Sequence, residues 1–299
     1  LKARLERDWR LTRGLKRTLK RVKTISPTSP NLLCDDLQAA VNDYRDQACL
    51  TFEGKTLTYG EMDAMANRFA HWGKGLNLRR GQTVALFLPN RMEYFPVWYG
   101  LSKIGVVTAL INNQLSGLAL AHCLNISGAA QVIVDAETCL VFDAAKGLLE
   151  RPMQQWVLGG HAQGGQRDLS QALKSCSQLP PDRSVRDGMT AKDTLLYIYT
   201  SGTTGLPKAA KVTHLRGQLY MRGFAGATGA TAKDRIYNVL PLYHATGGLC
   251  AMGAAFLNGG SVVLRRKFSA SHFWSEVADE GCTMFVYIGE LCRYLVNQP

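Results

Sequence analysis

The sequence has 299 residues, of which 46% are hydrophobic and 19% are charged, and its formal net charge is +12. This composition is typical of a folded globular protein and excludes a disordered chain, and no apolar run reaches the roughly 20 residues that a membrane-spanning helix needs. The eight cysteines form no CxxC pair and have no histidine at metal-ligand spacing, so we expect them to be reduced and the protein to be cytoplasmic.

The first 23 residues carry most of the excess positive charge, with ten Lys or Arg residues against Glu6 and Asp8. A helix over this segment would place seven apolar residues within an arc of roughly 160°. They are Leu1, Leu5, Trp9, Leu11, Leu15, Leu19 and Val22. Two interpretations are open: such a helix can lie in the interface of a membrane, at its cytoplasmic face, or it can dock on its own domain through the apolar side. We expect no nucleic-acid partner, because no nucleic-acid-binding motif accompanies the charge.

From about residue 30 onward, short β-rich runs alternate with helical patterns. The clearest strands are Thr83–Phe87, Gln131–Val134, Thr194–Tyr199, Ile236–Leu240, Ser261–Leu264 and Thr283–Tyr287. The clearest helices are Tyr59–Leu76, Met92–Ile104, Ala119–Ser127, His214–Gly226 and Ala270–Glu280. Apolar strands that alternate with helices indicate βαβ units, so the sequence predicts an α/β fold with mostly parallel sheets.

Between about Leu158 and Asp193 the composition shifts toward Gly, Gln, Ser, Pro and Asp. A change of this kind is typical of a connection between two structural parts. We therefore expect a basic N-terminal arm over residues 1–29, a first α/β half over residues 30–190, and a second over residues 191–299.

The segment YTSGTTGLPK, from Tyr199 to Lys208, follows the predicted buried strand and is expected to form a loop. Open α/β sheets bind ligands at this end of their strands. Gly202 and Gly205 let the backbone approach an anion, while hydroxyl groups and the charge of Lys208 supply what a polyphosphate needs. The hydroxyl groups belong to Thr200, Ser201, Thr203 and Thr204. The segment does not fit the GxxxxGK[ST] pattern, and a flexible linker is the alternative interpretation.

This segment resembles the phosphate-binding signature of the adenylate-forming superfamily. Three downstream segments, LPLYHATG, VVLRRKFSASHFW and YIGELCRYLVNQP, resemble the long- and very-long-chain fatty acyl-CoA synthetases, a branch that includes the fatty acid transport proteins. The resemblance extends upstream through LTYGEMDAMANRFAHW and covers the chain from about residue 30 to its end. It implies the N-terminal part of the adenylate-forming enzyme fold, with two α/β halves whose mostly parallel sheets are flanked by helices.

The resemblance implies a ligase that uses ATP, Mg²⁺ and CoA to convert a fatty acid to acyl-CoA through an acyl-adenylate. The alternative is a non-catalytic, membrane-associated protein for fatty-acid binding or uptake that retains the fold. On the first interpretation, Lys208, Thr204 and His244 take part in catalysis, although His244 could instead cap the next helix. The nucleotide phosphates would be held by Thr200, Ser201, Gly202, Thr203, Thr204, Gly205 and Lys208.

The resemblance also implies a channel for the acyl chain. Small residues at Gly247 and Gly248 would leave room for it, and tight packing of a helix on a sheet is the alternative for each. The residues implied in substrate binding are Tyr243, Gly247, Gly248, Tyr287 and Gly289. No metal ligand is assigned. Family members continue beyond the position of Pro299 with a metal-binding glutamate, a ribose-binding aspartate and a C-terminal domain, so we expect an N-terminal fragment that is inactive by itself.

Overall fold

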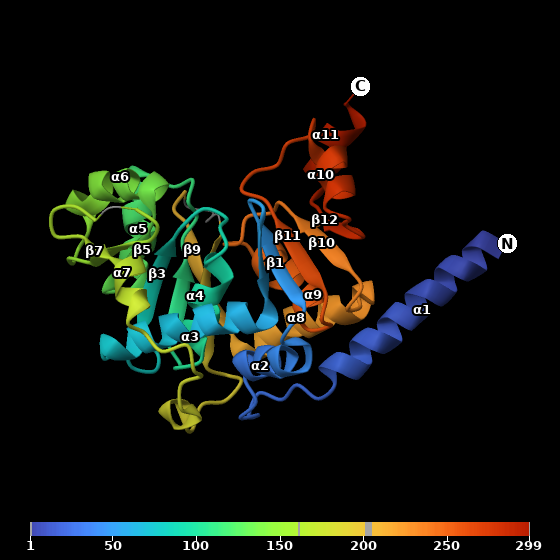
Figure 1. The fold of residues 1–299 in the computed structure, drawn as a ribbon, viewed down its shortest axis with the longest axis horizontal. Helices are drawn as coiled ribbons and strands as arrows, with labels where there is room; N and C mark the ends of the chain where they lie inside the picture. The colour runs from blue at the N-terminus through green and yellow to red at the C-terminus, as the bar shows by residue number, and fades with distance from the viewer. Residues whose placement is uncertain (1, 161, 201–204, 299) are drawn as a thin grey trace. The chain divides into compact units, whose positions relative to one another are not determined.

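The structure is a computed structural model that describes residues 2–160, 162–200 and 205–298, with side chains from Glu6 onward. The chain forms two compact units (Figure 1). One unit, which we call the split unit, combines Leu1–Met62 with Leu215–Pro299, and the other, the continuous unit, comprises Asp63–His214.

The continuous unit is built on a seven-stranded sheet in the order β7-β6-β5-β3-β4-β8-β9. Neighbouring strands are parallel except for β8 and β9, which form an antiparallel pair at one edge. The strands are β3 (Thr83–Phe87), β4 (Val107–Leu110), β5 (Gln131–Val134), β6 (Gln154–Val157), β7 (Arg167–Asp168), β8 (Thr194–Thr200) and β9 (Lys208–Thr213).

Helices cover this sheet, and the central strands are buried along their whole length, as expected for parallel strands with helices on both faces. One face packs against α5 and α6 in a core that includes Phe87, Ala109, Val132 and Phe142. The helices are α3 (Tyr59–Gly75), which begins in the split unit, α4 (Tyr94–Ser102), α5 (Gly117–Ser127), α6 (Ala136–Ala145) and α7 (Leu169–Lys174), with 3₁₀ turns at Lys146–Leu148 and Arg183–Arg186.

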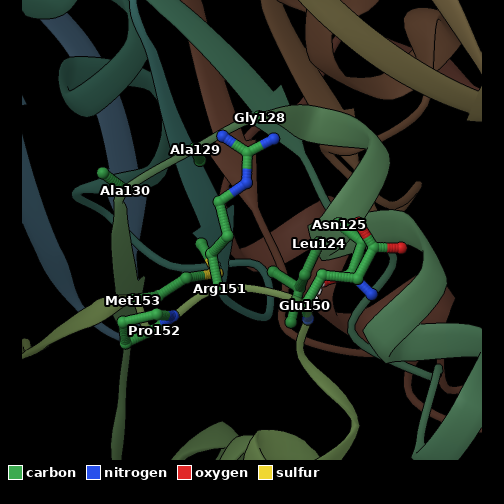
Figure 2. A pocket seen from close by; sticks show the side chains of 9 residues that line it. All are labelled: Leu124, Asn125, Gly128, Ala129, Ala130, Glu150, Arg151, Pro152 and Met153. Atoms are coloured by element: carbon green, nitrogen blue, oxygen red, sulfur yellow. Dashed lines mark hydrogen bonds between the residues drawn. The ribbon is translucent and has the colours of Figure 1, made fainter.

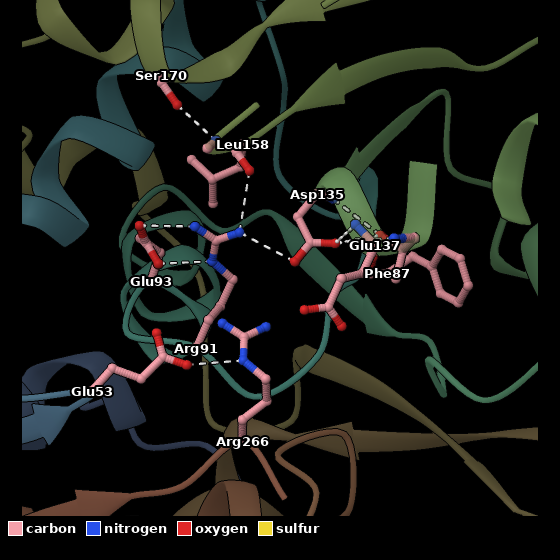
Figure 3. Close-up of polar contacts among 11 residues, drawn as sticks. Glu53, Phe87, Arg91, Glu93, Asp135, Glu137, Leu158, Ser170 and Arg266 are labelled. Atoms are coloured by element: carbon pink, nitrogen blue, oxygen red, sulfur yellow. Dashed lines mark hydrogen bonds and ion pairs between the residues drawn. The ribbon is translucent and has the colours of Figure 1, made fainter. Parts of the chain in front are cut away.

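Arg91 fastens the carboxyl ends of several strands of the continuous unit together (Figure 3). Its Nε lies 2.8 Å from Glu93 Oε2, and its Nη1 lies 3.3 Å from Asp135 Oδ2 and 3.2 Å from the carbonyl oxygen of Leu158. Only 14% of the Arg91 side chain is exposed, so its charge is compensated by these carboxylates rather than by water. We interpret the cluster as structural.

The split unit is built on a five-stranded sheet in the order β12-β10-β11-β1-β2, in which only β2 is antiparallel to its neighbour. Its strands are β1 (Ala48–Phe52), β2 (Lys55–Thr58), β10 (Arg235–Asn238), β11 (Ser261–Leu264) and β12 (Met284–Val286). Its helices are α1 (Lys2–Val22), α2 (Leu33–Tyr44), α8 (His214–Thr228), a π-helix at Thr246–Ala251 that continues into α9 (Met252–Phe256), α10 (Phe273–Asp279) and α11 (Gly289–Val296).

The predicted fold class is confirmed, and each predicted strand and helix is present within a few residues of its expected bounds. The two units, however, do not divide within Leu158–Asp193, where we expected the boundary. The strand after that segment, β8, pairs in parallel with β4 and so extends the same sheet. The early strand β1 instead pairs with β11, which places the N-terminal residues with the C-terminal ones.

None of the eight cysteines forms a disulfide, in agreement with the expectation that they are reduced. Among the residues that the structure describes, no helix has both the length and the apolar character that a membrane span requires.

Candidate functional site

The predicted phosphate-binding loop connects the two strands of an antiparallel hairpin. Thr200, the last residue of β8, lies opposite Lys208, the first residue of β9. The sequence predicted the strand before the loop but not β9 after it. The hairpin fixes Thr200 and Lys208 at the mouth of the loop, at the carboxyl end of β8, where parallel sheets bind ligands.

The described part of the loop is open and suited to an anion. Gly205 has a φ of +88°, a conformation that favours glycine, and a Cβ added there would meet no atom within 4 Å. Lys208 is exposed, so its ammonium group is available to a ligand. These features fit a polyphosphate. The other predicted residues of the loop lie outside the described residues: Ser201, Gly202, Thr203 and Thr204.

Two adjacent residues of α5 contact the segments before and after this loop. These contacts were not predicted from the sequence. His122 Nε2 lies 3.0 Å from the carbonyl oxygen of Pro207, and the hydroxyl of Tyr199 donates to the carbonyl oxygen of Cys123 at 3.0 Å. Burial raises the pKa of Tyr199, so the hydroxyl keeps the proton that it donates. His122 had been given no role, because its partner is 85 residues away in the sequence.

His244 lies in the split unit, in a turn that follows β10. Its backbone N–H donates to the carbonyl oxygen of Pro241 at 3.2 Å, and its carbonyl oxygen accepts from Gly248 at 2.8 Å. The residue keeps an exposed surface, and its ring packs on Tyr243 with centroids 4.5 Å apart. Partial burial lowers the pKa of His244 below its ordinary value, which favours a neutral imidazole. Among the described residues its imidazole has no hydrogen-bonding partner.

Asn238, the last residue of β10, organises this turn and was not singled out from the sequence. The residue is fully buried. Its Oδ1 accepts from the backbone N–H of Leu240 at 3.1 Å, and its Nδ2 donates to the carbonyl oxygen of Gly247 at 3.1 Å. Asn238 therefore ties the start of the turn to the π-helix after His244. A lone amide at the end of an apolar strand was the only available signal.

The two glycines predicted to leave room for an acyl chain are tightly packed. A Cβ added to Gly247 would lie 2.6 Å from the carbonyl oxygen of Pro241, and one added to Gly248 would lie 2.1 Å from that of Leu242. Both glycines therefore allow the π-helix to approach the turn closely, which agrees with the alternative that these glycines serve tight packing. A π-helix of this kind often occurs at a functional site.

Tyr287 and Gly289 follow β12 and are both exposed. Tyr287 borders an apolar pocket of the split unit, whereas no other residue of the predicted substrate site lines it. The pocket lies between α8, α9 and the strands β10 and β12. It is lined by Phe224, Thr228, Ile236, Ala254, Met284, Phe285, Val286 and Tyr287.

A pocket of the continuous unit lies at the amino ends of its parallel strands, whereas Thr200 lies at the carboxyl end of β8 (Figure 2). Its lining residues come from the end of α5 and from the segments that lead into β5 and β6. They include Gly128, Ala130, Arg151 and Met153. This end is away from the carboxyl ends of the strands, where such folds bind ligands, and no predicted site residue lines the pocket.

The predicted site residues are divided between the units. The continuous unit carries Thr200, Gly205 and Lys208, and the split unit carries His244, Tyr243, Gly247, Gly248, Tyr287 and Gly289. Within the split unit, His244 and Tyr287 follow β10 and β12, which are parallel neighbours, so both residues lie beyond the carboxyl ends of the strands. The described residues contain no group of three or more His, Cys, Asp or Glu side chains that could hold a metal.

Arg266 lies beyond the carboxyl end of β11, at the same end of the split-unit strands as His244 and Tyr287. Its Nε lies 3.0 Å from Glu53 Oε1 (Figure 3). Its guanidinium lies over the ring of Phe52, 5.4 Å from the ring centroid. Nothing in the local sequence pattern distinguishes Arg266 from a surface arginine.

Comparisons with known proteins agree with this architecture. Residues 37–299 match the family of AMP-binding enzymes. Long-chain fatty acid transport protein 6 of Mus musculus is 38% identical over 256 residues, which cover 85% of this chain and 41% of that protein. Long-chain fatty acid transport protein 1 of Homo sapiens is 39% identical over 82% of this chain and 38% of its own length. The chain thus spans about two fifths of the length of these relatives.

The fold is also similar to that of solved structures. The N-terminal domain of FACL13 from Mycobacterium tuberculosis, in an inhibitor-bound crystal structure, is 25% identical and superimposes with a TM-score of 0.78. The similarity covers 90% of this chain and 65% of that one.

Proposed function

The chain belongs to the family of AMP-binding enzymes, and we propose that it is part of a ligase that activates long- or very-long-chain fatty acids to acyl-CoA through an acyl-adenylate. The observation that carries this proposal is the loop at the carboxyl end of β8. It combines the sequence TSGTTGLPK with an open, exposed hairpin mouth that ends in Lys208.

In the first step, a carboxylate oxygen of the fatty acid would attack the α-phosphorus of ATP, and pyrophosphate would leave. Two anions must approach each other in this step, so positive charge and oriented N–H and O–H donors lower its barrier. Thr200 and Lys208 lie opposite each other on β8 and β9, and the Thr200 hydroxyl and the Lys208 ammonium group would hold the β- and γ-phosphates. The residues Ser201, Gly202, Thr203 and Thr204 would complete this cradle. Mg²⁺, when bound, would neutralise phosphate charge.

In the second step, the thiolate of CoA would attack the acyl carbon, the bond between that carbon and the phosphate oxygen would break, and AMP would leave. In the first step, before the adenylate forms, His244 would orient the fatty acid carboxylate through a ring N–H. A neutral imidazole suits this task, because it donates a hydrogen bond without fixing the carboxylate in a strong ion pair.

The apolar pocket beside Tyr287 supports a fatty acyl substrate. Its wall contains Phe224, Ile236 and Met284, whose side chains exclude water from a hydrocarbon chain. The exposed Tyr287 could close one end of the chain-binding region. Gly247 and Gly248 would act indirectly, by holding the π-helix against the turn that carries His244.

A second candidate function is non-catalytic fatty-acid binding or uptake at a membrane. The names of the relatives, which are called fatty acid transport proteins, favour it. On this interpretation the protein would bind fatty acids in the apolar pocket without releasing pyrophosphate.

The two functions are distinguished by pyrophosphate release from the complete protein with ATP, CoA and fatty acids of graded chain length. We expect release, and we expect Lys208→Ala and Thr204→Ala each to lower it by about 100-fold, as the loss of one charge-stabilising donor does. Lys192→Ala is the control, because this lysine is exposed in the same unit and outside the loop. Unchanged release in both loop variants would refute the assignment of the loop. Fatty-acid binding without any release would favour the second function.

A further inference from the structure

Four apolar residues of helix α1 are exposed. The exposed fractions are 59% for Trp9, 72% for Leu11, 57% for Leu15 and 54% for Leu19. We call these four residues the apolar stripe. Isolated exposed leucines are common on proteins, but a tryptophan and three leucines exposed along one helix form an apolar surface that favours a partner.

The helix docks on its own unit through a different face. Arg17 Nε donates to the carbonyl oxygen of Gly226 at 3.0 Å, and Arg21 donates to the side-chain oxygen of Asn258. A Cβ added to Gly226 would lie 2.6 Å from the Cα of Thr18, so the backbones of α1 and α8 are in close contact (Figure 1). The interpretation that α1 docks on its own domain through its apolar side is therefore wrong.

Cations accompany the apolar stripe. At about 100° per residue, Lys16 and Lys20 lie on either side of Trp9, and both lysines are exposed. Asp8 also lies on this side of the helix, but its charge is offset by Arg7, whose Nη2 is 3.1 Å from Asp8 Oδ1. On the exposed side of α1 the three leucines thus lie together with the Arg7–Asp8 pair, and Trp9 lies between the two lysines.

We propose that the apolar stripe inserts into the interface of an anionic lipid membrane while the opposite face of α1 remains docked on α8. Tryptophan and leucine side chains enter the boundary between headgroups and acyl chains, and lysines beside them attract anionic headgroups. The contacts of Arg17 and Arg21 with the split unit keep the helix attached, so insertion tethers that unit to the lipid surface. The inference stands independently of the proposed ligase reaction.

The test is flotation of the full chain with vesicles of phosphatidylcholine alone or mixed with phosphatidylglycerol. We expect binding to the mixed vesicles that weakens between about 0.1 M and about 1 M salt, where the screening length falls from about 10 Å to about 3 Å. The variant Trp9→Ala/Leu15→Ala/Leu19→Ala should bind at least about tenfold more weakly, because it loses apolar surface. Its matched control is Leu140→Ala/Leu179→Ala, since these leucines are 76% and 73% exposed in the other unit.

The charge is tested separately. Lys16→Gln/Lys20→Gln should weaken binding to the mixed vesicles roughly 25-fold at low salt, whereas the exposed pair Lys192→Gln/Lys233→Gln should change it less than about twofold. These variants touch none of the docking contacts, and an unchanged thermal unfolding curve would confirm that they fold. Equal binding by wild type and all variants, or no binding at all, would overturn the proposal. Concentration-dependent dimers that the stripe variant abolishes, without vesicle binding, would identify a second copy as the partner and overturn it too.

Discussion

The Nε2 atom of His122 lies 3.0 Å from the carbonyl oxygen of Pro207, at the end of the predicted phosphate loop. A carbonyl oxygen only accepts, so Nε2 carries the proton, in the neutral ring as well as in the charged one. The adjacent Cys123 accepts from Tyr199 before the loop. One turn of α5 therefore holds both arms of the loop, and we interpret His122 as a positioning residue.

We expect His122→Ala to loosen the loop without unfolding the protein. The loss of one half-buried hydrogen bond costs about 1 kcal/mol, which corresponds to an increase of about fivefold in the KM for ATP of the complete protein. In the 299-residue chain, amide hydrogen exchange at Lys208 and Ala209 should accelerate. His122→Gln can donate from its side-chain amide and should restore part of the effect. An unchanged KM together with unchanged exchange would contradict this role.

Substitution of Gly248 should be far more harmful than substitution of Gly289. An alanine Cβ at Gly248 would meet the carbonyl oxygen of Leu242 at 2.1 Å, and backbone cannot move aside as a flexible side chain can. We expect Gly248→Ala to lower the free energy of unfolding by about 3 kcal/mol or more in urea denaturation. Gly289 begins α11 and has no atom within 4 Å of such a Cβ, so Gly289→Ala should be neutral or stabilising by less than about 1 kcal/mol. Similar losses in both variants would show that the π-helix is not closely packed on the turn.

His244 should titrate below the ordinary histidine value of 6.5, because partial burial disfavours its charged form. NMR titration of the six histidines, with His244→Gln to assign the signal, measures this directly. Since the folded-state pKa is the lower one, the unfolded chain binds more protons, and the contribution of His244 to stability decreases as the pH falls below about 6.5. A midpoint at or above 6.5 would contradict the partial burial of the ring.

The sequence predicted the buried strands better than the edges. The bounds of β3, β5 and β11 agree with the predicted ones, because short apolar runs between turn residues have few alternatives in an α/β protein. The strand β9 was not predicted, since its sequence KAAKVT alternates weakly and becomes a strand through its pairing with β8. The unit boundary was also missed, because the pairing of Leu50 with Val262 joins residues that are far apart in the chain.

The candidate site shows the same limit. The phosphate-binding loop could be predicted from its glycines, hydroxyls and lysine, since these residues carry a local pattern. The contact of His122 with Pro207 could not, because it depends on how α5 packs beside β9. The docking face of α1 was missed for a related reason: Gly226 contacts Thr18 through its backbone and therefore leaves no hydrophobic signal in the sequence.

Lys103 is a buried cation that should be needed for the stability of the continuous unit. Its Nζ lies 2.6 Å from Asp63 Oδ1 and 2.7 Å from Asn67 Oδ1, and Tyr99 also donates to Asp63, at 2.8 Å. Lys103→Met would leave the buried carboxylate of Asp63 without its counter-charge, so we expect the free energy of unfolding to fall by about 3–5 kcal/mol in urea denaturation. Adding Asp63→Asn removes the orphaned charge, and the double variant should recover part of this loss. If Asp63→Asn lowers the free energy of unfolding as much in Lys103→Met as it does in the wild type, the two side chains are not coupled and the ion pair contributes nothing.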